Sequence, residues 1–311
     1  MMVPAVLLLL GALTAVVAPR LLARADWPDR EPVVALWVWQ CVVAAVLVCC
    51  ALAMTLSAAA AWQAVRGHVF APAPRAVVEA YALNGSGPWA AVTALVLAGA
   101  GLWSGAMLVR EIAAARTRLR HQRHELSLRA PLLPGEEPAA GRLVVLEGER
   151  PEAWWLPGGV PRLVVTTAAL RRLKGRRLDA VLAHEQGHAR ARHDWLLRCS
   201  AALAAGFPQV PVFAAFRAEM HRLVELAADD TASRRFGRLT TALALVELNE
   251  DRGVFGPSPG PQAHVPQRVH RLLAAPGRLT AARRLRLTAA AALVPVLPVL
   301  VTLVPALRTL G

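Results

Sequence analysis

Four long apolar blocks constrain this chain more than any other feature. They cover residues 3–18, 33–61, 89–109 and 287–307. Each block reaches or approaches the length of about 20 residues that a helix needs to cross the hydrocarbon core of a membrane. Hydrophobic residues make up 56% of the sequence and its mean hydropathy is +0.42, which is too apolar for an ordinary soluble protein. The pattern predicts four membrane spans.

The distribution of charge predicts how these spans are oriented. The segment 111–287 contains 28 of the 35 Lys and Arg residues and 17 of the 21 Asp and Glu residues, an excess of 11 positive charges. Under the positive-inside rule, this segment and the loop 20–30 are cytoplasmic, while the loop 64–88 lies outside. The first block lacks the positive n-region of a cleaved signal peptide. It is therefore expected to remain a span of a bacterial plasma-membrane protein, with its N-terminus outside.

The positive charge does not indicate binding to nucleic acid. Only one basic residue is a lysine, Lys174, and alanine and arginine abound throughout the chain, as the codons of a GC-rich genome would produce. No recognised DNA-binding signature accompanies the charge, so no direct contact with nucleic acid is expected. The four cysteines indicate neither a disulfide framework nor a metal-binding pair.

Three short runs after the third block have the composition of β-strands. They cover residues 142–148, 152–159 and 161–167, they are rich in branched or aromatic residues, and Gly or Pro bounds them. A linker rich in Pro and Gly, residues 130–141, precedes them. We expect these runs to form a small antiparallel sheet, followed by helices.

The sequence HEQGH, residues 184–188, predicts a metal site on one of these helices. His184 and His188 are four residues apart, so their imidazoles project from the same face of a helix and can bind one Zn²⁺. Glu185 lies beside that face, where its carboxylate can take a proton from water that the metal activates. A charged surface helix could carry the same five letters by chance, but the apolar run before the motif and the small Ala183 and Gly187 favour a packed site. His193 would be rotated by about 140° from His188 on a continuous helix, so we expect a helix end or a local polar contact there and not a ligand.

A second helix offers the remaining ligand. In residues 219–232, Glu225 and Asp229 are four apart and share a face, so the first can bind the metal and the second can orient a ligand imidazole. His221 is the competing ligand and Asp230 the competing orienting group. An ordinary acidic helix surface is the alternative to both roles.

The apolar segment 195–216 between the two helices resembles a fifth span. A single crossing would place Glu225 on the opposite side of the membrane from His184 and His188. Because Pro208 and Pro211 interrupt the segment, a hairpin that enters the bilayer and returns is the better interpretation.

The segments around this site resemble a known family. EAWWLPGGVPRLVVTTAALRRLKGRRLDAVLAHEQGHARARHDW, residues 152–195, the apolar segment after it, and ELAADDTA, residues 225–232, resemble the BlaR/MecR family of membrane zinc metalloproteases. The arrangement of four spans around a metal domain is similar too. The resemblance implies a gluzincin in which His184, His188 and Glu225 bind zinc, Glu185 is the general base and Asp229 orients a ligand. It also implies that RLVVTT, residues 162–167, is the edge strand that pairs with an extended substrate.

The sequence also departs from that family. The sensor members continue after the last span into an extracellular penicillin-binding domain, whereas this sequence ends at Gly311, so antibiotic sensing is not expected to carry over. The HtpX and CAAX-protease group shares HExxH and the later glutamate–aspartate pair. AHVPQRVHRLL, residues 263–273, resembles the downstream His-Pro and Arg motif of that group with a different spacing. His264 or Arg268 is then a candidate for stabilising the oxyanion, with a loop cap and a solvated helix face as alternatives.

These features combine into one expectation. The chain is a mostly α membrane protein with four transmembrane helices, and an α+β HExxH zincin-like metalloprotease domain lies between spans three and four. Residues 1–110 form a three-span region, residues 111–286 the cytoplasmic zinc domain with its re-entrant hairpin, and residues 287–311 the last span and a short tail. The expected function is zinc-dependent hydrolysis of a protein or peptide at the bilayer, with cleavage of a transcriptional repressor as one option. The alternatives are an HtpX/CAAX-like processing or quality-control protease and a catalytically silent metal-binding scaffold.

Overall fold

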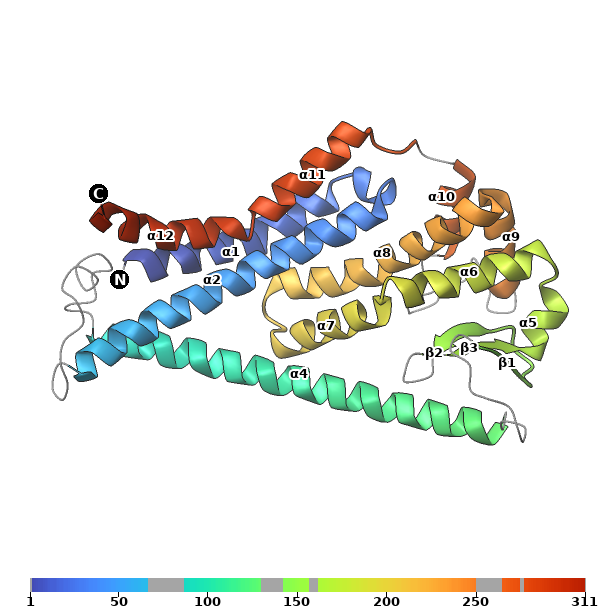
Figure 1. The fold of residues 1–311 in the computed structure, drawn as a ribbon, viewed down its shortest axis with the longest axis horizontal. Coiled ribbons are helices and arrows are strands. Elements are labelled where there is room, and N and C mark those ends of the chain that lie inside the picture. Colours follow the sequence, from blue (N-terminus) through green and yellow to red (C-terminus); the bar gives the residue numbers. More distant parts are fainter. Residues whose placement is uncertain are drawn as a thin grey trace.

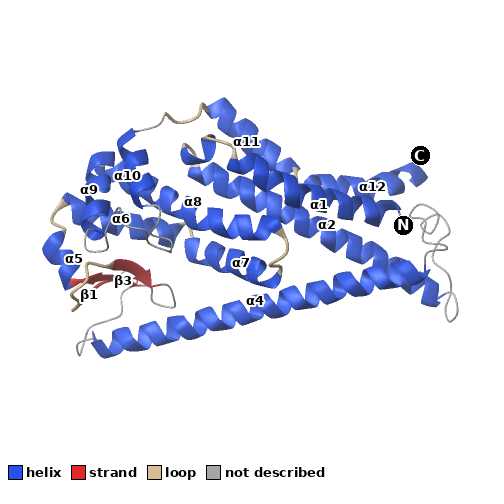
Figure 2. Cartoon of the chain, turned by 180° about the vertical axis from the view of Figure 1, so that it is seen from behind, coloured by secondary structure: helices blue, strands red, loops and turns tan. Residues whose placement is uncertain are grey.

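The structure, a computed structural model, describes residues 2–66, 87–129, 142–156, 162–249, 265–274 and 277–310. It is mostly helical and contains one small sheet, as Figures 1 and 2 show. Its elements are α1 (Met2–Ala23), η1 (Trp27–Asp29), α2 (Pro32–Arg66), α4 (Gly87–Arg129), β1 (Arg142–Leu146), β2 (Ala153–Leu156), β3 (Arg162–Thr166), α5 (Thr167–Arg172), α6 (Arg176–Arg190), α7 (His193–Gly206), α8 (Pro211–Phe236), α9 (Arg238–Asn249), α10 (Val265–Ala274), α11 (Ala281–Leu293) and α12 (Val296–Leu310).

Three helices in the described ranges are long and apolar enough to cross a membrane. The candidate spans are Val3–Ala23, Pro32–Ala59 and Leu95–Leu128. The fourth predicted span is a pair of helices, Ala281–Leu293 and Val296–Pro305, bent by 44° at a short break, and it counts as a span only if the pair crosses as one unit. The mostly helical fold with several long apolar helices is therefore confirmed, while the number of four spans stays a prediction.

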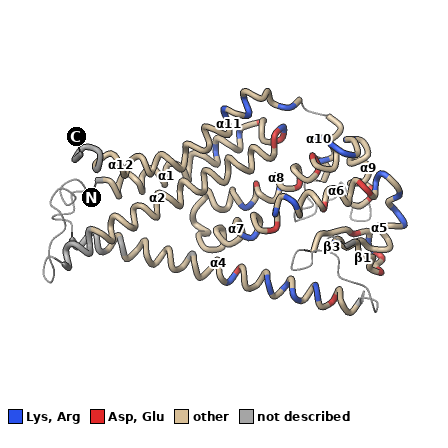
Figure 3. Tube along the Cα trace, in the orientation of Figure 1, with Lys and Arg blue, Asp and Glu red and all other residues tan. Residues whose placement is uncertain are grey.

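Charged residues are separated from the apolar ends of the helices along the length of the molecule. Figure 3 shows that α12, most of α1 and the adjoining part of α2 carry almost no charged side chain, whereas α6, α8, α9, α10 and the far half of α4 carry many. The connection between α1 and α2 lies at the charged end, where the Arg222 guanidinium pairs with Asp29. This connection and the charged helices α8 and α10 therefore lie at the same end of the molecule.

The sheet is mixed, which corrects the antiparallel sheet that we expected. Its strand order is β1-β3-β2, with β3 parallel to β1 and antiparallel to β2. The connection from β1 to β2 passes over the end of β3 and is held there by the Thr166 hydroxyl. That hydroxyl donates to the Arg150 carbonyl at 2.7 Å and accepts from the Glu152 N–H at 3.0 Å. Because β1 and β2 are thus placed on either side of β3, they do not pair with each other.

The same topology corrects the expected edge strand. RLVVTT forms β3, the central strand, whose backbone groups are already paired on both sides. The strand next to the HExxH helix α6 is β2, and its Trp155 N–H points away from β3 to the Glu185 carboxylate at 3.2 Å. A substrate strand can therefore add to β2 and not to β3.

The apolar segment 195–216 forms a helical hairpin. α7 runs to Gly206, the chain turns through residues 207–210, and α8 returns. The turn packs among the long helices, since the Trp103 indole N–H of α4 donates to the Gly206 carbonyl at 2.9 Å. The chain therefore reverses within this segment, which brings α8 back to α6. The depth of the hairpin in a membrane stays a prediction.

One hydrophobic cluster joins the hairpin to the long helices. The buried side chains come from α1, α2, α7 and α8, and the ring centroids of Trp39 in α2 and Phe216 in α8 lie 6.3 Å apart with the planes tilted by 43°. The cluster continues along α8 to Val224 and Leu226, which flank Glu225 in the sequence. Packing of the long helices thus fixes the position of the helix that carries the candidate carboxylate ligand.

Helices α6 and α8 approach each other closely at Gly187. A Cβ atom built on Gly187 would lie 3.3 Å from the Thr231 Cβ and 3.4 Å from the Ala228 Cα, closer than most such contacts in proteins. The absent side chain of Gly187, one position before His188, therefore sets the separation between the two halves of the candidate site.

Replacing Gly187 should force these helices apart. We expect Gly187→Val to lower the free energy of unfolding by about 1–3 kcal/mol, the usual cost of overpacking, and to weaken zinc binding. Denaturation in detergent and zinc titration measure the two effects. Gly105→Val is the matched control, because nothing lies within 4 Å of a Cβ on Gly105. Equal behaviour of the two variants would contradict the close approach.

Candidate metal centre

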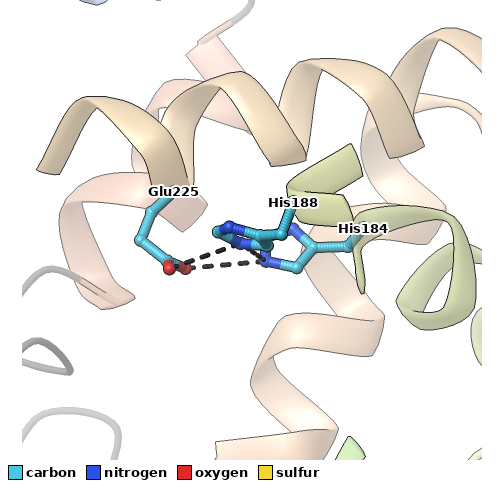
Figure 4. Close-up of side chains that lie close together, drawn as sticks. All are labelled: His184, His188 and Glu225. Atoms are coloured by element: carbon cyan, nitrogen blue, oxygen red, sulfur yellow. Dashed lines mark hydrogen bonds and ion pairs between the residues drawn. The ribbon is translucent and has the colours of Figure 1, made fainter. Parts of the chain in front are cut away.

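Three side chains from α6 and α8 converge on one point. The Nε2 atoms of His184 and His188 lie 3.2 Å apart. Glu225 reaches both rings, with Oε2 at 3.5 Å from the His184 Nε2 and Oε1 at 3.5 Å from the His188 Nε2. Figure 4 shows the two imidazoles and the carboxylate pointing toward one another. Among the described residues they form a group that could hold a metal ion, with ligand atoms all within 4.8 Å of one another.

The spacing of these atoms suits zinc. Ligand atoms about 2.0–2.1 Å from a tetrahedral Zn²⁺ lie about 3.3 Å from one another. The two imidazole nitrogens, 3.2 Å apart, are close to that edge length, and each oxygen of Glu225 lies 3.5 Å from one of them. Two imidazole nitrogens and a carboxylate oxygen are also ligands that Zn²⁺ takes in proteins. The predicted ligand set His184, His188 and Glu225 is therefore brought together in a geometry that fits the ion, although its role as ligand stays a prediction.

Asp229 lies behind His184. Its Oδ1 is 3.0 Å from the His184 Nδ1, so the carboxylate accepts from that nitrogen and leaves Nε2 for the metal. Of the competing groups, Asp230 pairs instead with Arg271 at 2.8 Å. His221 is absent from the group of described residues that could bind the ion. The arrangement thus places Asp229, and not Asp230, where a group that orients the imidazole would be.

Arg268 joins the two carboxylates, which differs from the role we expected. Its Nε and Nη2 donate to Asp229 at 2.8 and 2.7 Å, and its Nη1 lies 2.7 Å from the Glu225 Oε2. The side chain is only 8% exposed. Because all three nitrogens contact these carboxylates, Arg268 is placed to neutralise and hold them, and not to face an oxyanion. The other oxyanion candidate, His264, lies outside the described residues.

His193 lies at a helix boundary and makes a local polar contact, as expected from the sequence, and its partner is the candidate ligand His188. Its Nδ1 lies 3.0 Å from the His188 Nδ1, and the residue is buried. The helix is interrupted between α6 and α7, where Arg192 adopts a left-handed φ of 52°. Because the helix is broken here, His193 is not held at the rotation of about 140° from His188 that a continuous helix would impose. His193 can therefore orient His188 as Asp229 orients His184.

Burial and charge together set the protonation of the site. Burial alone raises the pKa of Glu225, but Arg268 and the two imidazoles hold it well below its usual range. Burial likewise opposes ionisation of Asp229, yet Arg268 lowers its pKa to about 2. Both carboxylates are therefore ionised at neutral pH and present negative charge to a cation.

The two imidazoles differ in their protonation. Burial lowers the pKa of His184, but hydrogen bonds to Asp229 and Glu225 outweigh it and raise the value to about 10. Burial, reinforced by the neighbouring His184, lowers the pKa of His188 to about 3. A metal ion at this site would replace the proton on the His184 Nε2, so its binding releases a proton.

Glu185 is poised for proton transfer. Burial is the main cause that raises its pKa to about 6, and the negative charge of Glu225 adds to the effect. Its carboxylate accepts from the Trp155 N–H of β2 at 3.2 Å, so it lies between the metal group and the free edge of the sheet. A carboxylate with a pKa close to neutral is suited to act as a general base.

A cavity of about 270 Å³ opens beside these residues. His184 and Glu185 of α6 and Glu225 and Asp229 of α8 form its polar wall. The apolar wall comes mainly from α9, with Ala244, Leu245 and Leu248. No sequence motif predicts this wall, because α9 is placed there by packing against α6, α8 and α10.

Comparison with known proteins places a peptidase domain over this site. Residues 117–229 match the model of Peptidase family M48, a family of zinc metalloproteases, and the match contains His184, Glu185, His188, Glu225 and Asp229. No curated protein and no solved structure matches the chain. Residues 117–229 are therefore similar to an M48 peptidase domain, which supports the metalloprotease class predicted from the sequence.

Removing Arg268 should leave two buried carboxylates without their counter-charge. We expect Arg268→Leu to lower the free energy of unfolding of the metal-free protein by about 3–5 kcal/mol, the typical cost of breaking a buried ion pair. Added Zn²⁺ should recover part of this loss, because a dication supplies the missing positive charge. Denaturation in detergent with a chelator and then with zinc measures both effects.

Arg190→Leu is the control for this experiment. Arg190 is exposed at the end of α6, so its loss should change the free energy of unfolding by about 0.5 kcal/mol or less. If Arg268→Leu behaved like Arg190→Leu, the guanidinium would not stabilise the two carboxylates.

Proposed function

We propose that the chain is a membrane-integrated zinc endopeptidase, which uses His184, His188 and Glu225 as metal ligands and Glu185 as general base. The observation that carries this proposal is the convergence of two imidazole nitrogens and a carboxylate within reach of one ion. A half-buried glutamate, Glu185, with a raised pKa follows His184 in the same helix. The M48-type domain over the same residues supports the reaction class.

The residues around the ion have separate tasks. When bound, zinc supplies a Lewis acid that lowers the pKa of water and polarises the scissile carbonyl. Glu185 takes a proton from the attacking water and passes it to the leaving amine nitrogen. Asp229 holds the His184 tautomer, and Arg268 keeps Asp229 and Glu225 ionised.

The substrate is proposed to bind in extended form along the free edge of β2. Glu152, the residue before this strand, accepts from the Thr166 N–H of β3 at 2.9 Å, while the Trp155 N–H points to Glu185. Since backbone groups alternate in direction along an antiparallel strand, those of Ala153 and Trp155 face outward. An added peptide strand would pair with the groups of Ala153 and the Trp155 carbonyl, beside Glu185, which accepts from the Trp155 N–H.

The lining of the cavity next to Glu185 favours some substrate side chains over others. Its α9 wall is apolar and its polar wall belongs to the metal group. An apolar side chain beside the scissile bond would cover Leu245 and Leu248, whereas an acidic one would meet Glu225 and Asp229. We therefore expect cleavage next to apolar residues.

Two biological settings are compatible with this chemistry. The M48 match favours an HtpX- or CAAX-protease-like role in membrane-protein processing or quality control, because M48 includes HtpX-like members. A BlaR/MecR-like role, in which a signal leads to cleavage of a repressor, rests on the sequence resemblance. A silent metal-binding scaffold is disfavoured, since a structural zinc usually has four protein ligands and the described residues supply three with a base beside them.

The membrane arrangement belongs to the same proposal. The three apolar candidate helices and the bent pair α11–α12 would form four spans of a bacterial plasma membrane. The excess of positive charge in residues 111–287 favours a cytoplasmic metal domain and an external N-terminus. The α7–α8 hairpin would then enter the bilayer from the cytoplasmic side and hold the site close to the membrane surface.

Two substitutions test the catalytic proposal. Glu185→Gln should retain zinc and lose peptide cleavage by about 10²-fold or more, because the amide cannot act as a base. Glu225→Ala should lose both zinc and cleavage, because it removes a ligand. Metal analysis of the purified protein and cleavage of a peptide library in detergent provide the two measurements.

Glu247→Gln serves as the matched control, because this glutamate pairs with Arg177 away from the metal group. It should keep both zinc and cleavage. Full activity in the Glu185→Gln protein would end the enzyme proposal, while retained zinc in Glu225→Ala would remove that residue from the ligand set.

The raised pKa of Glu185 predicts the acid side of the pH profile. As a base Glu185 must be ionised, so kcat/KM should rise with pH through a midpoint at or below about 6, since a bound cation lowers the pKa further. Initial rates at several pH values, with zinc content checked at each, measure this limb. A midpoint well above neutral pH would mean that another group is the base.

A further inference from the structure

Four arginines meet in a small pocket outside the metal centre. The pocket is formed by the connection between α1 and α2, the helices α8, α9 and α10, and the segment before α11. It is lined by Arg30, Asp230, Arg238, Arg271, Leu272 and Arg278. We call it the arginine pocket. Its residues come from five separate segments, so only the tertiary fold brings them together.

Two contacts hold the inner part of the pocket in place. The Arg271 Nη2 donates to the Asp230 Oδ1 at 2.8 Å, and its Nε donates to the Asp29 carbonyl at 2.5 Å. The Asp29 side chain is in turn paired with Arg222 of α8. The segment that carries Arg30 is therefore fixed against α8 and α10, and the buried Leu279 fixes the segment that carries Arg278.

The charge of the pocket is not balanced by the protein. Four guanidinium groups face one carboxylate, and that carboxylate is already paired with Arg271. Arg30, Arg238 and Arg278 are exposed and form no ion pair with any residue in the described part of the chain. Converging like charges repel one another, and an anion that binds between them relieves this repulsion.

The guanidinium group indicates which anion fits. Its planar fork of N–H donors matches phosphate oxygens and binds them through paired, charge-assisted hydrogen bonds. The enclosed space is about 10 Å³, which admits roughly one water-sized group. One phosphate oxygen would enter the pocket, and the others would contact the three exposed arginines at its rim.

The position of the pocket indicates that a membrane lipid is one source of the phosphate group. Arg30 precedes α2 by two residues, and α2 contains the candidate span Pro32–Ala59, so the pocket lies beside the start of a long apolar helix. Arg278 precedes the basic first turns of α11 by three residues. Basic pockets beside membrane helices at the cytoplasmic face are suited to the headgroups of anionic lipids.

We propose that the arginine pocket is a binding site for a phosphate group, carried by an anionic phospholipid or by a soluble phosphate compound. The site is independent of peptide hydrolysis, because none of its residues contacts a proposed zinc ligand. It nevertheless shares α8 and α10 with the metal centre, where Asp230 follows Asp229 and Arg271 lies one turn after Arg268.

Titration with inorganic phosphate tests the shared chemistry. The full chain in a neutral detergent should bind phosphate saturably at one site, as measured by calorimetry against sodium chloride of equal ionic strength. The double variant Arg238→Gln/Arg278→Gln should bind at least about tenfold more weakly, since it removes two charge-assisted contacts. Both arginines are exposed and unpaired, so the variant should melt at the same temperature as the parent.

The matched control is Arg283→Gln/Arg286→Gln. It removes the same charge from exposed positions on α11 outside the pocket, so it should change the phosphate affinity less than about twofold. A control that weakens binding as much as the test variant, or a parent protein without saturable binding, would overturn the proposal.

Vesicles distinguish the two sources of the phosphate group. If the lipid occupies the pocket, the chain in phosphatidylglycerol-containing vesicles should bind inorganic phosphate more weakly than in phosphatidylcholine vesicles, and the double variant should remove the difference. If a soluble compound is the ligand, the affinity should be equal in both vesicles and still depend on Arg238 and Arg278. Affinities that do not depend on these arginines in either vesicle would refute the site.

Discussion

The reversal of the chain between α7 and α8 is the constraint on which the candidate site depends. The histidine pair precedes an apolar segment and Glu225 follows it, so the three side chains can meet only if that segment turns back. The turn at residues 207–210 packs among the long helices, and the buried aromatic residues of α8 join the same cluster as Trp39. Each such side chain contributes roughly 1.5–3 kcal/mol on burial. Packing of the apolar region therefore positions a polar centre at its end.

At that centre, close packing and charge act together. Gly187 lets α6 and α8 approach until a Cβ atom would be crowded, which brings the imidazoles within reach of Glu225. Arg268 from a third helix then balances two carboxylates that burial alone would neutralise. With both imidazoles neutral, the two carboxylates and the guanidinium leave one net negative charge. A bound cation balances this charge and takes the place of the proton on His184. Helices α8 and α10 also carry residues of the arginine pocket, so the two helices connect that pocket to the candidate metal centre.

Much of the fold could be predicted from periodicity and composition. Three of the four apolar blocks lie in long helices, the fourth lies in the bent pair α11 and α12, and the three β-like runs contain the three strands. Strand pairing was not predictable, because it depends on the Thr166 hydroxyl that holds the β1–β2 connection across β3. As a result the strand beside Glu185 is β2 and not β3.

The sequence by itself determined which residues carry the chemistry. A spacing of four places His184 with His188, and Glu225 with Asp229, on single helix faces, and local geometry alone fixes such pairs. The tertiary structure decided which faces meet and what surrounds them. Arg268 binds the two carboxylates, His193 reaches His188 across a helix break, and α9 closes the cavity. These contacts join residues through packing of distant segments, and one-dimensional spacing does not encode how separate helices pack.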